Sequence, residues 1–72
     1  MENDPHIRNA LRHMSWAQLS TKAREAEFNR DYGKAKILWI YAQHIARLSL
    51  NKTLAAAKVR FCEQKLDRSH GE

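Results

Sequence analysis

The sequence predicts an all-α fold, in which an antiparallel helical hairpin carries a third helix laid across it. Two observations lead to this prediction. Apolar residues recur three and four positions apart, as they do along one face of a helix. The two glycines and the single proline lie where these periodic segments begin or end, and no segment has the alternating pattern of a strand. A chain of 72 residues forms one domain and hides only about 60% of its unfolded surface. We therefore expect a second chain, either another copy or a partner protein, to complete the core.

Residues 1–14 are predicted to be a short leading helix or an N-terminal arm. Asp4 and Pro5 suit the start of a helix, because aspartate caps free amide groups and proline presets the backbone of the first turn. Ile7, Leu11 and Met14 follow at helical spacing.

Residues 15–67 are predicted to form the helical domain, and its first helix begins with a capping box. Ser15 and Gln18 stand three positions apart, the spacing at which each side chain binds the other's backbone amide. A turn-forming cluster at residues 29–33 ends this helix. Its apolar stripe consists of Trp16, Leu19, Ala23 and Ala26.

The second helix is predicted to begin after Asp31 as its cap and to run through Arg47. Small residues surround Trp39 on its apolar face, so a neighbouring helix can approach closely. That face consists of Ala35, Leu38, Trp39, Ala42, Ile45 and Ala46. Ile40 and Tyr41 lie outside it, and apolar residues outside the core of so small a chain suggest an interface.

The third helix is predicted to begin after Asn51 as its cap. Leu54 starts its apolar face and Phe61 broadens it. The face itself consists of Ala55, Val59, Cys62 and Leu66. The polar residues 68–72 are expected to fray as a tail.

The net charge of +5 lies entirely in residues 32–72, because residues 1–31 are balanced. A basic half attracts nucleic acid or an acidic protein surface, although it also suits a plain solvated face. The first turns of the third helix, residues 52–57, lack the asparagine, glutamine and arginine that read base edges. Sequence-specific DNA binding is therefore disfavoured, whereas nonspecific attraction to phosphates stays open.

No pattern in the sequence points to an enzyme, a cofactor or a metal. No two of its four histidines stand four positions apart, and Cys62 is the single cysteine. The chain also shows no secretory signal, and its longest apolar run, residues 37–42, is far shorter than the ~20 residues of a membrane span. We therefore expect a cytoplasmic, non-catalytic protein without cofactors that binds no membrane.

The spacing of small and aromatic residues from Ala23 to Ala42 resembles one tetratricopeptide hairpin. More closely, residues 19–62 are similar to the AraC negative regulator (ANR) family of small bacterial proteins. At Leu54-Ala55 this chain departs from the second tryptophan of the family pattern. The similarity is carried by Ala23, Glu27, Asp31-Tyr32, Ala35, Leu38-Trp39, Ala42, Ala46, Asn51 and Arg60-Phe61-Cys62.

This resemblance implies a protein that binds an AraC/XylS-type transcription activator and blocks it, with nucleoid-associated proteins as further partners. Apolar anchors would dock on the activator while basic residues steer the approach. The residues expected to form that partner-binding face are Ile40, Tyr41, Leu54, Lys58 and Phe61. Two alternatives remain open at this point: a small basic nucleic-acid-binding protein, and a helical homo-oligomer or assembly module of a phage or plasmid complex.

Overall fold

The computed structural model describes the backbone of residues 13–71, and from residue 16 onward this range is α-helical apart from two short connections. Helix α2 spans Trp16–Phe28, α3 spans Tyr32–Ile45 and α4 spans Ser49–Gly71. The expected N-terminal helix or arm, residues 1–14, lies almost wholly outside the described residues. In the described range, no helix has both the length and the hydropathy needed to cross a membrane.

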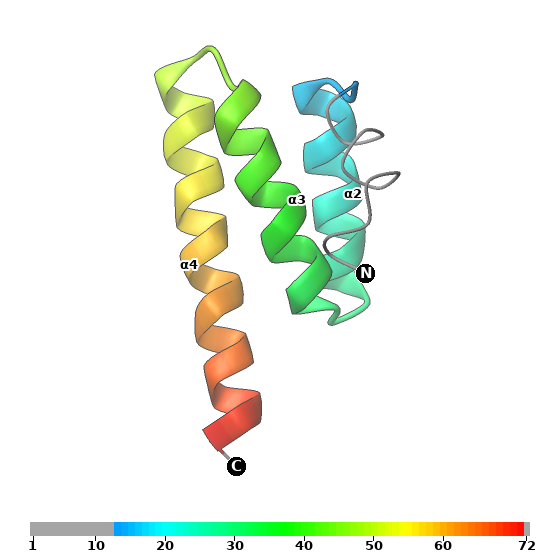
Figure 1. Cartoon of the computed structure of the whole chain (residues 1–72), viewed down its shortest axis with the longest axis vertical. Coiled ribbons are helices and arrows are strands. Elements are labelled where there is room, and N and C mark those ends of the chain that lie inside the picture. The colour runs from blue at the N-terminus through cyan, green and yellow to red at the C-terminus, as the bar shows by residue number, and fades with distance from the viewer. Residues whose placement is uncertain (1–12, 72) are drawn as a thin grey trace.

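Consecutive helices run in opposite directions, with α3 between α2 and α4 (Figure 1). Both outer helices pack on α3, as short connections require. The all-α hairpin with a third helix is therefore confirmed, with one change. We expected the third helix to lie across the hairpin, but α4 runs alongside α3 because a three-residue connection, 46–48, brings the chain straight back.

The core lies where small side chains let the helices close around one large aromatic. Trp39 is fully buried, and the tilted ring of half-buried Trp16 lies 6.1 Å from it, centroid to centroid. The predicted stripes of all three helices supply the rest of this core. Its buried members are Leu19, Ala23, Ala26, Ala35, Leu38, Trp39, Ala42, Ala55 and Cys62.

The start of α2 and the turn after it follow local rules. Ser15 and Gln18 form the predicted capping box, with both reciprocal hydrogen bonds present at 2.9 and 3.2 Å. Asp31 caps α3 by accepting a hydrogen bond from the Lys34 amide at 3.2 Å. Gly33, which we placed in the turn, instead lies inside the first turn of α3.

The bounds of the later helices differ from prediction. Helix α3 ends at Ile45, two residues before Arg47, and α4 begins at Ser49, so Asn51 lies inside the first turn and is not its cap. The Lys52 amide already donates to the Leu48 carbonyl at 3.0 Å. At the other end α4 continues to Gly71, through most of the segment that we expected to fray.

Candidate interaction site

Phe61 is the centre of the most distinctive surface on α4. Although Val59 and Cys62 face the core, Phe61 keeps 37% of its surface exposed. Its ring stands edge-on to Tyr32 with centroids 6.0 Å apart. The ammonium groups of Lys58 and Lys65 lie 5.6 and 5.5 Å from the ring centroid, within cation–π range. An exposed ring held by contacts on several sides is suited to act as a rigid anchor.

Beside this ring, an open groove runs along the outward side of α4. We call it the α4 groove; its lining residues are Thr53, Ala56, Ala57, Arg60, Phe61 and Gln64. Four of them, at positions 53, 57, 60 and 64, repeat the spacing of the core stripe at 55, 59, 62 and 66 with an offset of two residues. Two residues turn a helix by about 200°, so the groove faces away from the core.

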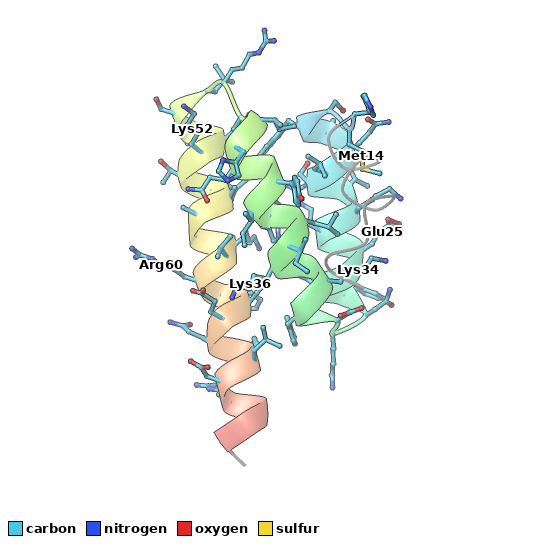
Figure 2. All side chains as sticks on the ribbon, in the orientation of Figure 1. Met14, Glu25, Lys34, Lys36, Lys52 and Arg60 are labelled. Carbon is cyan, nitrogen blue, oxygen red and sulfur yellow. The ribbon has the colours of Figure 1, made fainter. Side chains whose placement is uncertain are left out.

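The orientation of single side chains agrees with this placement (Figure 2). Arg60 points away from α3 on the outer side of α4, whereas Lys36 of α3 reaches over α4. There the Lys36 ammonium lies 3.3 Å from a carboxylate oxygen of Glu63. This ion pair marks the side of α4 that faces α3.

Lys58 is less available to a partner than its charge suggested. Its ammonium lies 3.4 Å from Oε1 of Glu27, and the other oxygen of Glu27 accepts a 2.5 Å hydrogen bond from the Trp39 indole N–H. Glu27 is only 14% exposed. A charge-assisted hydrogen bond to a mostly buried carboxylate is stronger than an exposed surface pair. Lys58 therefore ties α4 to α2, in addition to lying beside Phe61.

The five predicted partner-binding residues do not share one surface. Leu54, Lys58 and Phe61 follow one another along a single edge of α4, at the i, i+4 and i+7 positions. Tyr41 packs against the core, which corrects the expectation that it lies outside. Ile40 is half-buried one turn after Lys36, on the side of α3 where Lys36 meets Glu63. Thus α4 brings three of the five together and leaves the two α3 residues apart.

Sequence reasoning missed three strongly exposed apolar side chains. Phe28 at the end of α2 is 88% exposed, and Leu48 and Leu50 at the start of α4 are 65% and 78% exposed. Phe28 follows the buried Ala26 by two positions, which places it about 200° around the helix from the core stripe. That offset was the available signal. Leu48 and Leu50 stand in the short connection and first turn, where helical periodicity gives no guide.

Cys62 is a buried thiol with little chemical reactivity. Burial, followed by the nearby charge of Glu27, raises its pKa to about 11, and the Lys58 ammonium offsets this only in part. The reactive form of cysteine is the thiolate, which is scarce here at neutral pH. Within the described residues, no cluster of three or more histidine, cysteine or acidic side chains could hold a metal ion.

Comparisons with models of protein families, with curated proteins and with solved structures found no match to this chain.

Proposed function

We propose that this chain is a non-enzymatic, protein-binding transcriptional regulator that antagonises an AraC/XylS-type activator by direct contact through the α4 groove. The observation that carries this proposal is Phe61, an exposed aromatic held rigidly at the edge of a groove that faces away from the core. Aromatic and arginine side chains are the commonest energetic anchors of protein interfaces, and Arg60 stands directly beside it.

The resemblance to the ANR family supports the choice of partner. Most residues that carry it have a packing role here: Trp39 and Cys62 are buried, and Asp31 caps α3. Arg60 and Phe61 are the members of the set that line the groove. If these two positions serve a partner, the same sequence pattern encodes both the fold and the binding surface.

The direct test is co-elution of the purified chain with an AraC-type activator by size-exclusion chromatography. Truncating Phe61 to alanine is expected to abolish the complex, because the anchor is lost. The matched control is Phe28→Ala, which removes an even more exposed aromatic at the C-terminal end of α2, outside the groove lining. If Phe28→Ala abolished binding and Phe61→Ala did not, the α4 groove would not be the binding site.

A nucleic-acid-binding function is the main alternative, since α4 carries most of the net charge. Phosphate contacts make log affinity fall steeply with log salt concentration, whereas apolar docking changes little. We therefore expect weak binding to random duplex DNA at about 0.15 M salt, where the Debye length is ~8 Å. Tight binding to duplex alone under those conditions would contradict the activator proposal.

A further inference from the structure

The α4 groove is apolar along its floor and basic at its rim. Ala56 and Ala57 leave the helix surface low enough for a second helix to approach closely, and Phe61 rises at one edge. The side chains described along residues 49–68 include five basic and two acidic groups, a net charge of +3. One of the two acids, Glu63, is paired with Lys36 on the side facing α3. Asp67 lies beyond the end of the groove.

The basic side chains near the groove lie at its edges, opposite the positions that the flanks of a docked helix would take. Arg60 lines the groove and is exposed, whereas Arg68, like Asp67, lies past its C-terminal end at Gln64. Lys52 stands beside Thr53 at the N-terminal end. A partner that covers the apolar floor must therefore bring its own flanking side chains close to these positive charges.

We infer that the α4 groove accepts an amphipathic helix of the partner protein, with small apolar side chains along its docking face and carboxylates along its flanks. From Thr53 to Gln64 the groove measures about 17 Å at 1.5 Å per residue, which corresponds to a partner helix of roughly three turns. This inference rests on the proposed function for the location of the binding surface, and it adds the chemistry of what binds there.

Charge separates this occupant from the other candidate, a second copy of the chain. A symmetric dimer through the groove would pack two copies of α4 against each other, each with Arg60 in the groove lining and no acidic residue there. Like charges across an interface oppose association. Carboxylates opposite Arg60 would instead form charge-assisted hydrogen bonds with its guanidinium group, and arginine makes these in bidentate form.

The test is selection from a displayed library of 18-residue amphipathic helices on the full-length chain at about 0.15 M salt. Each apolar position of the library holds alanine, leucine or phenylalanine, and each flanking position holds glutamate, glutamine or lysine in equal amounts. We expect recovered helices to favour glutamate over lysine at the flanks. We also expect them to bind the Arg60→Glu variant about tenfold or more weakly, because the charge reversal replaces attraction to the flanking glutamates by repulsion.

The matched control is Arg24→Glu, which reverses an exposed charge on α2 and should leave binding unchanged. Circular dichroism of both variants checks that the fold is kept. The inference is overturned by any of four results: no recovered helices, no glutamate preference, equal binding to Arg60→Glu, or self-association that competes with the peptides. Acidic helices recovered without any activator binding would overturn the proposed function alone, whereas activator binding that ignores Arg60→Glu would overturn this inference alone.

Discussion

At the scale of single residues, Glu27 connects all three described helices through one side chain. It belongs to α2, accepts the indole hydrogen bond of Trp39 in α3, and pairs with Lys58 in α4. The Glu27 side chain is only 14% exposed, so water cannot easily replace either partner. The buried indole N–H of Trp39 depends on it for a hydrogen-bond acceptor.

We predict that Glu27→Ala lowers the free energy of unfolding by about 1–3 kcal/mol, the cost of leaving a buried donor unsatisfied. Glu27→Gln keeps an acceptor oxygen and should cost less. Urea denaturation followed by circular dichroism measures both. The control is Glu25→Ala, which removes an exposed glutamate about half a turn before Glu27 on the same helix. It should change the free energy of unfolding little. Equal effects at positions 25 and 27 would show that the hydrogen bond to Trp39 contributes nothing.

Cys62 gives the fold a dependence on alkaline pH. Its pKa is about 11 in the folded chain and 9.0 for the free group, so between these values the unfolded chain has lost the proton while the folded chain keeps it. The unfolded state then binds fewer protons, and the free energy of unfolding falls as pH rises. The contribution of the Cys62 thiol to the free energy of unfolding is fully present below pH 9 and is lost as the pH rises towards 11.

We predict that the urea midpoint of the wild type falls more steeply between pH 9 and pH 10.5 than that of Cys62→Ala. The variant lacks the thiol, while every other ionisable group is common to both chains. A reducing agent keeps the thiol free during the measurement. Parallel curves for the two proteins would mean that burial does not hold the Cys62 proton.

At the scale of elements, the turn between α2 and α3 holds a non-glycine residue in the left-handed backbone conformation. The Asp31 amide donates to the Ala26 carbonyl at 2.8 Å, and the Arg30 amide donates to the Glu27 carbonyl at 2.9 Å. This pair of bonds is the Schellman motif, whose left-handed position is usually a glycine. Here Arg30 occupies it with φ of 61°, where a side chain crowds the backbone.

We predict that Arg30→Gly raises the free energy of unfolding by about 1 kcal/mol, since glycine adopts a positive φ without that strain. Thermal unfolding followed by circular dichroism is the measurement. Lys34→Gly, in the exposed first turn of α3, is the control and should lower stability, because glycine is a poor helix residue where φ is negative. A loss of stability in both variants would mean that the side chain of Arg30 stabilises the turn by more than its strain.

The ends of helices were predicted well where they depend only on residues close together in the sequence. The capping box of Ser15 and Gln18 and the cap at Asp31 depend on side chains three positions apart, and both are present. The start of α4 was placed at Asn51, but Ser49 already lies in the helix. Several residues in this segment can cap a helix, and the choice among them follows from how α4 must return along α3.

The candidate site was predictable only in part, for a similar reason. Phe61 was expected to contact a partner. The predicted core stripe of Ala55, Val59, Cys62 and Leu66 also indicates which side of α4 faces away from the core. The pairing of Lys58 with Glu27, in contrast, joins residues 31 positions apart. Periodicity within one helix carries no information about such a contact, because it depends on how α2 and α4 are placed on either side of α3.

At the scale of the whole molecule, the core consists of many small residues around few large ones. Five of its nine buried members are alanines, and the largest fully buried side chains are Trp39, Leu19 and Cys62. Alanine lets the helices approach closely but contributes little buried apolar area. A domain of this size is stable by only about 4–11 kcal/mol, at roughly 0.05–0.15 kcal/mol per residue. Its folding therefore depends heavily on the single buried tryptophan.

We predict that Trp39→Ala abolishes cooperative unfolding at room temperature. Truncating a buried tryptophan costs about 3–5 kcal/mol, which is about half of the stability expected for so small a domain. The variant also leaves Glu27 without its indole donor. Circular dichroism across a urea titration is the measurement. The matched control is Trp16→Ala, because Trp16 is half-buried against the same ring and its loss should lower the midpoint without removing the transition. If Trp39→Ala instead unfolded cooperatively near the wild-type midpoint, the alanine-lined contacts between the helices would be enough to stabilise the fold without the Trp39 side chain. The chain alone would then be more stable than its small core suggests, and it would need no partner to fold.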